Sequence, residues 1–173
     1  MRKLTILIMA LGLLIWTGTT AQAANDGTVA VTSTITQSLA MTVSPTSWDV
    51  PSMTIQDTET TFTPALAGYF TVTNSGNGTS YMDIKAAVTT GSCTLGSTPG
   101  ANIYRIGYGQ ATGTAPSCSA PSSYTVITGT DGHLATITAA GMYLFDLELQ
   151  SPTSTTYGGV QQTITVTITA KTS

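Results

Sequence analysis

The chain has 173 residues, of which 41% are hydrophobic and 8% are charged, with a formal net charge of −3. This balance excludes an intrinsically disordered chain, which needs low hydrophobicity and high net charge, and a helical bundle, which needs many more Glu, Lys and Arg residues. It also argues against nucleic acid as a partner, because the chain lacks the excess of basic residues that binds a phosphate backbone.

Residues 1–23 have the form of a cleaved secretory signal peptide. Arg2 and Lys3 supply the basic start, Leu4–Trp16 supplies an apolar stretch, and Ala21-Gln22-Ala23 ends the segment with small residues. The apolar stretch is about 13 residues long, whereas a helix needs roughly 20 to cross the hydrocarbon core of a bilayer. We therefore expect a secreted, extracellular or cell-surface protein that has no membrane anchor after cleavage.

Removal of the signal peptide changes the charge of the chain. Lys85, Arg105 and Lys171 then remain against eight acidic residues, which gives a net charge of −5. So few charges produce little long-range repulsion between copies, which permits close association.

Residues 24–44 are predicted to form an N-terminal strand, within which apolar side chains alternate with Thr, Ser and Ala from Thr28 to Val43. This period of two predicts a half-buried strand, either continuous or broken near Gln37 and Ser38. Its apolar positions are Val29, Val31, Ile35, Leu39, Met41 and Val43.

The rest of the chain, residues 45–173, shows the same alternation between clusters of turn-forming residues. Further strands are predicted at 69–73, 81–88, 103–108, 124–127, 134–138, 142–150 and 160–170. Two antiparallel sheets that face each other bury one side of such strands and leave the other side in water. We therefore predict an all-β protein with a single antiparallel β-sandwich of immunoglobulin-like or jelly-roll kind, containing eight to nine strands.

The two cysteines, Cys93 and Cys118, lie in loops after the signal peptide. In an oxidising compartment, an even pair of cysteines is most simply one disulfide. The bridge would close a loop of about 26 residues and stabilise the fold by about 3 kcal/mol.

No group of residues has the pattern of a catalytic centre. His133 lies in a glycine-flanked turn, where we expect it to be exposed, and no serine motif accompanies it. Asp146 and Glu148 are two residues apart on one face of a predicted strand, and we expect both carboxylates to point to solvent. A glycosidase needs two carboxylates across a cleft, so we expect a protein that is not an enzyme.

A bound calcium ion is also considered, because several oxygen-bearing side chains lie in predicted turns. These are Asp49, Asp57, Glu59, Asp131 and the segment from Asn74 to Asn77. Their spacing does not match an EF-hand, so no metal ligands and no cofactor are assigned.

Two segments carry a resemblance to a known class of proteins. The strand–turn–strand around Val72–Asn77, and Leu147–Pro152 followed by a long Thr/Ile/Val strand, resemble secreted prokaryotic immunoglobulin-like β-sandwich surface proteins. That class includes biofilm-fibre subunits and bundling-pilus subunits. The resemblance contains no diagnostic motif and is an analogy of fold.

This resemblance implies donor-strand complementation, in which the N-terminal strand of one subunit completes the sheet of the next. Residues 24–43 have the required form, and head-to-tail contacts of this kind would give an open homopolymer. The same alternation fits a strand that pairs within its own domain, so both interpretations stand. The expected function is a structural subunit of an extracellular filament, pilus-like fibre or surface coat. The alternative is an adhesin or carbohydrate-binding domain that recognises a glycan.

Overall fold

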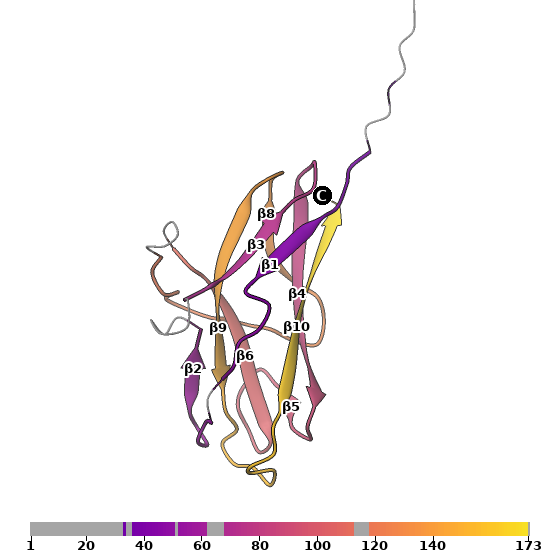
Figure 1. Cartoon of the computed structure of the whole chain (residues 1–173). Helices are drawn as coiled ribbons and strands as arrows, with labels where there is room; N and C mark the ends of the chain where they lie inside the picture. Colours follow the sequence, from indigo (N-terminus) through magenta and orange to yellow (C-terminus); the bar gives the residue numbers. More distant parts are fainter. Residues whose placement is uncertain (1–32, 34–35, 51, 62–67, 113–117, 173) are drawn as a thin grey trace, which may run out of the picture. The chain divides into compact units, whose positions relative to one another are not determined.

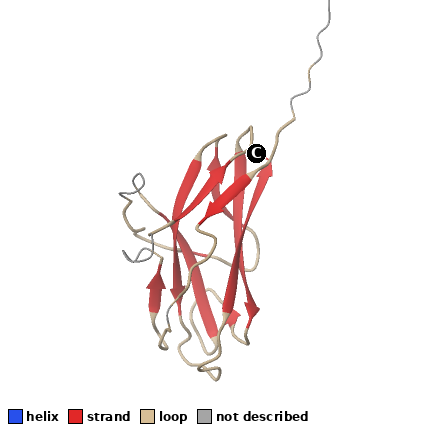
Figure 2. Cartoon of the chain, in the orientation of Figure 1, coloured by secondary structure: helices blue, strands red, loops and turns tan. Residues whose placement is uncertain are grey.

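The computed structural model describes residues 33, 36–50, 52–61, 68–112 and 118–172 (Figure 1). From Thr36 onward, the chain forms one compact unit. Every regular element in the described ranges is a strand (Figure 2), and none of these ranges contains a helix able to cross a bilayer. The predicted signal peptide, and Val29, Val31 and Ile35, lie outside the described residues.

The described residues form ten strands. They are β1 (Met41–Ser44), β2 (Thr58–Thr60), β3 (Phe70–Asn74), β4 (Ser80–Thr90), β5 (Thr94–Leu95), β6 (Ile103–Gln110), β7 (Thr125–Val126), β8 (Gly132–Ile137), β9 (Met142–Gln150) and β10 (Thr163–Thr172). The longer strands are rich in Thr, Val, Ile and Tyr, whose branched or aromatic side chains suit a pleated surface.

The larger sheet has seven strands in the order β1-β3-β9-β6-β5. Both β3 and β2 pair with one side of β9, and β6 pairs with its other side. Strand β7 pairs with β6 at Gly107 and Tyr108. All of these pairs are antiparallel except β5 with β6, where a two-residue parallel ladder joins Thr94 to Ile103.

The smaller sheet has three strands in the order β10-β4-β8. Strand β4 lies in the centre and pairs antiparallel with both neighbours. Its pairing with β10 runs from Thr90 opposite Thr163 at one end to Ser80 opposite Thr172 at the other.

The two sheets share one hydrophobic core. Alternate residues of β9 and β4 supply much of it, so that Phe145 and Leu147 from the larger sheet meet Met82 and Ile84 from the smaller one in a single buried cluster. Phe70 stacks on Phe145 with ring centroids 5.4 Å apart. The all-β class is confirmed. The predicted number of strands is too low, because β2 and β5 have only two or three residues and show no alternation.

The predicted disulfide is not formed in the structure, where Cys93 and Cys118 are free thiols. Cys93 precedes Thr94, whose amide donates to Asn102 O just before β6 begins. Cys118 precedes Ser119, which pairs with Thr112 beyond the end of β6. Ten extended residues span roughly 30 Å, whereas a disulfide joins Cα atoms about 4.4–6.8 Å apart. Sequence spacing alone carried no information about this separation.

We expect the native protein to contain two free thiols. Alkylation without reduction, followed by mass spectrometry, should label Cys118 readily and the buried Cys93 slowly. A protein that resists alkylation until it is reduced would contain the intrachain bridge and would contradict the strand arrangement around β6.

Candidate functional site

The segment before β1 is fastened to the turn that joins β3 to β4. Asn77 makes two of these contacts: its Nδ2 donates to Thr36 O (3.0 Å) and its Oδ1 accepts from Ser38 N (2.7 Å). Gln37 Nε2 donates to Thr79 O (2.6 Å). A Cβ atom on Gly76 would lie 2.2 Å from Ser38 O, so only glycine permits this approach.

This arrangement divides the candidate donor strand. Met41 and Val43 lie opposite Asn74 and Val72 of the same chain and pack against the core. Leu39 is 42% exposed. From Thr36 onward, the segment therefore belongs to its own subunit, as the intramolecular interpretation predicts. The part that remains a candidate for donation is residues 24–35.

Strand β10 has a partner along only one edge within the described part of the chain. Its side chains alternate between exposed threonines and inward apolar residues, namely Ile164, Val166, Ile168 and Ala170. These inward residues are only partly buried, whereas Met82 and Ile84 of the adjacent β4 are at most 2% exposed. The core is thus incompletely covered beside the outer edge of β10.

A buried polar cluster lies on the other face of β9, away from the core. The carboxylate of Asp146, which is fully buried, accepts hydrogen bonds from the hydroxyls of Thr61 and Tyr124 (2.5 Å for Tyr124). The Thr61 hydroxyl oxygen also accepts from Leu147 N (2.9 Å). These bonds hold the end of β2 and the segment before β7 against the larger sheet.

Two glycines of β6 make room for this cluster. Gly107 and Gly109 lie opposite Glu148 and Asp146 on β9. A Cβ atom on Gly109 would lie 2.4 Å from Pro121 Cβ, so the segment before β7 passes directly over the sheet at this point. Glycine inside a strand permits such a close approach of backbone.

An ion pair extends the cluster along β9. Arg105 pairs with Glu148, and both side chains are at most 15% exposed. Arg105 also donates to Tyr124 O (3.2 Å), and Gln150 Nε2 donates to Glu148 Oε1 (3.1 Å). The prediction that Asp146 and Glu148 point to solvent is wrong. They share one face as expected, but other segments cover that face.

We expect the buried cluster to make the stability of the protein sensitive to alkaline pH. Burial, and then the hydrogen bond to Asp146, raise the pKa of Tyr124 well above its ordinary value of 10. The unfolded phenol ionises near pH 10 while the folded one keeps its proton, so stability is complete below that pH and falls above it. Urea unfolding between pH 8 and 11 should show this decline, and Tyr124→Phe should make it shallower. Tyr157→Phe, which removes an exposed phenol, is the control; an equal slope in both variants would contradict the assignment.

Gly109→Ala should lower the free energy of unfolding by about 2 kcal/mol, because the added methyl group overlaps Pro121 and displaces Tyr124 from Asp146. Gly129→Ala is a matched control, since its Cβ would meet nothing closer than 3.9 Å. Chemical denaturation measures both variants. Equal stability of the two would show that the segment before β7 does not lie against β6.

His133 lies on the outer face of the smaller sheet, as predicted for an exposed residue. Its side chain is 55% exposed, with Nδ1 4.0 Å from Asp83 Oδ1 and Nε2 3.5 Å from Thr136 Oγ1. The side chains of Asp83, His133 and Thr136 thus follow the order carboxylate, imidazole, hydroxyl that a catalytic triad has. However, both distances are at or beyond the limit of a hydrogen bond, and Lys171 binds Asp83 at 2.5 Å. His133 lines neither of the two hollows described below.

The same face collects two of the chain's basic residues. Lys85 and Lys171 both bind Asp131 (3.2 and 3.1 Å), and these hydrogen bonds lower the pKa of Asp131. The bond to Asp83, followed by the bond to Asp131, raises the pKa of Lys171. The charges on this face are therefore compensated locally.

The side chains named as possible calcium ligands do not come together. Asp131 binds two lysines, Asp57 Oδ1 accepts from the amide of Thr58, and Asn74 donates to Gly78 O and Ile137 O. Within the described ranges, no three acidic, histidine or cysteine residues form a group able to hold a metal ion.

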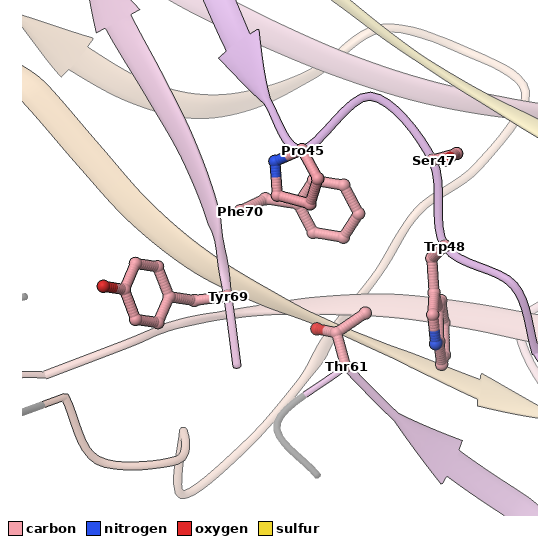
Figure 3. A pocket seen from close by; sticks show the side chains of 6 residues that line it. All are labelled: Pro45, Ser47, Trp48, Thr61, Tyr69 and Phe70. Atoms are coloured by element: carbon pink, nitrogen blue, oxygen red, sulfur yellow. The ribbon is translucent and has the colours of Figure 1, made fainter. Parts of the chain in front are cut away.

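Two small hollows lie at the surface. The first, about 20 Å³, has room for about one water molecule; its lining residues are Pro45, Ser47, Trp48, Thr61, Tyr69 and Phe70 (Figure 3). Within the described residues, the buried Trp48 Nε1 has no hydrogen-bond partner. The second hollow, about 250 Å³, is lined mostly by polar residues around Asp57 and Gln150. Neither brings a nucleophile together with a general base.

Two features thus stand out: the open edge of β10 and the buried polar cluster around Asp146. The sequence signal for the cluster is a pair of glycines two residues apart within a strand, Gly107 and Gly109. No protein-family model, curated protein or solved structure matches the chain.

Proposed function

We propose that the chain is an exported structural subunit of an extracellular filament, pilus-like fibre or surface coat, and that copies assemble by β-strand complementation. The observation that carries this proposal is the outer edge of β10, a ten-residue strand beside an incompletely covered core. A strand from another copy would supply the missing backbone hydrogen bonds and cover the apolar side chains.

The arrangement of the two sheets supports a β-sandwich of immunoglobulin-like or jelly-roll kind. The sheets bury one common core, and adjacent strands are mostly antiparallel. A fold of this kind serves many functions, so the assembly proposal depends on the open edge of β10 and not on the fold.

The charged side chains also support close association of copies. Arg105, Lys85 and Lys171 each pair with an acidic group of the same subunit. So few charges remain unpaired that copies repel one another weakly, and contacts through backbone and apolar side chains can decide whether copies associate.

Electron microscopy of the mature protein, residues 24–173, tests this proposal. Regular filaments that grow with protein concentration are expected. A uniformly monomeric protein, shown by analytical ultracentrifugation over the same concentrations, would refute it.

A glycan-binding adhesin is a second candidate, favoured by one exposed aromatic residue. Tyr81 is 43% exposed and lies edge-on to His133, with ring centroids 5.5 Å apart, close to the charged residues of the smaller sheet. Aromatic faces flanked by polar groups suit sugar rings. Binding on a glycan array that Tyr81→Ala abolishes and Tyr157→Ala preserves would support this candidate, whereas binding to no glycan would remove it.

A further inference from the structure

The described strands offer several edges to an incoming strand, and they differ in length and protection. Strands β1, β2, β5 and β7 have two to four residues each. Strand β8 has six, its pairing with β4 contains a bulge, and the Tyr108 hydroxyl already binds His133 O (2.8 Å). Short strands, bulges and charges are the usual protection of an edge. Strand β10 has ten residues and no charge before Lys171.

We infer that the outer edge of β10 receives residues 24–35 of a second copy as an antiparallel strand. The inference rests on the proposed function and extends it by naming the acceptor strand, the donor residues and their direction. The occupant follows from the length and pattern of the chain ahead of Thr36. Twelve extended residues span about 40 Å, enough to cover the roughly 33 Å of β10. Val29, Val31 and Ile35 would lie on the same face of an extended strand, and no charged residue follows Asp26 in this stretch.

The direction of the donor follows from where the chain enters its own domain. Thr36 and Gln37 are fastened to the turn at residues 74–79, and Ser80, at the end of that turn, lies opposite Thr172. The donor segment therefore leaves from the end of the domain that also holds the end of β10. The opposite end holds Thr90 and Thr163.

Two orientations of a second copy are then distinguishable. If the second copy presents its Thr163 end, residue 35 lies near Thr163 and residue 24 near Thr172, so that the donor runs antiparallel to β10. Each copy then receives one strand and donates another, which gives an open polymer. If the second copy presents its Thr172 end, the donor runs parallel, and the contact can close as a reciprocal dimer. Antiparallel ladders are also the more stable per residue.

Disulfide trapping between separate chains tests the acceptor, the direction and the face. All variants are made in mature protein whose own cysteines are removed by Cys93→Ala and Cys118→Ala. A donor chain carries either Ser33→Cys or Val29→Cys. Each donor chain is mixed with an acceptor chain that carries either Ile164→Cys or Ile168→Cys. Glutathione disulfide serves as the oxidant: each cross-link joins two thiols, and the oxidant takes up their protons and electrons as two reduced glutathiones. Because the two cysteines are on different chains, a dimer that disappears on reduction reports only an intermolecular contact. Circular dichroism confirms that each variant is folded.

The antiparallel arrangement predicts dimers for Ser33→Cys with Ile164→Cys and for Val29→Cys with Ile168→Cys, and not for the exchanged pairs. Ala30→Cys, whose side chain would lie on the opposite face of the donor strand, should give no dimer with Ile168→Cys. Dimers only from the exchanged pairs would overturn the direction. Filaments in the microscope without any cross-link to β10 would overturn the acceptor strand but leave the proposed function standing. Monomers without cross-links would overturn both.

Discussion

Asp146→Ala is expected to lower the free energy of unfolding by about 2–4 kcal/mol. The carboxylate is fully buried and is the acceptor for the hydroxyls of Thr61 and Tyr124. Removing it leaves two donors without their partner, and each unsatisfied buried group costs about 1–3 kcal/mol. Urea denaturation monitored by circular dichroism measures the loss.

Asp49→Ala is the matched control, since Asp49 is exposed and its removal should change stability by less than about 0.5 kcal/mol. Asp146→Asn keeps the shape and one acceptor oxygen, so its loss should be intermediate. If Asp146→Ala were no more damaging than Asp49→Ala, the cluster would not hold the covering segments to the sheet.

Deletion of residues 24–35 is expected to abolish filaments and leave a folded monomer. The compact unit begins at Thr36, and residues 36–40 keep their contacts with the turn at 74–79 in the truncated chain. The free energy of unfolding should therefore change little, while polymers disappear from electron micrographs and from sedimentation profiles.

A longer deletion that also removes residues 36–44 is the comparison. It takes away β1 together with Met41 and Val43, which pack against the core, so it should destabilise the domain itself. If the shorter deletion unfolds the protein, residues 24–35 act within their own subunit. If the shorter deletion still forms filaments, the donor lies elsewhere.

Much of the fold was predictable, because alternation reports directly which side of a strand is buried. The strand at 142–150 is found at those residues, and Met82, Ile84 and Ala86 face the core as their spacing indicates. Strand β7 lies within the strand predicted at 124–127, whereas strands β2 and β5 were not predictable. Strands β2 and β5 have only two or three residues, too few to show a hydrophobic alternation, and pairing with adjacent strands holds them in place.

The candidate site was predictable only in part. Alternation placed Asp146 and Glu148 on one face of a strand, but it could not reveal that the segment before β7 covers that face. This information depends on tertiary packing at Gly107 and Gly109. The separation of Cys93 from Cys118 likewise depends on the path of β6 between them. The alternation of residues 24–43 fitted an internal and a donated strand equally, and the structure places its end from Met41 in the subunit's own sheet.

The most direct test of strand complementation is hydrogen exchange along β10, measured before and after assembly of the mature protein. An edge strand bonded on one side leaves alternate amides open to solvent, so about half of the β10 amides should exchange rapidly in the monomer. After assembly, all of them should be protected. Assembled protein in which those amides still exchange as fast as in the monomer would contradict the account.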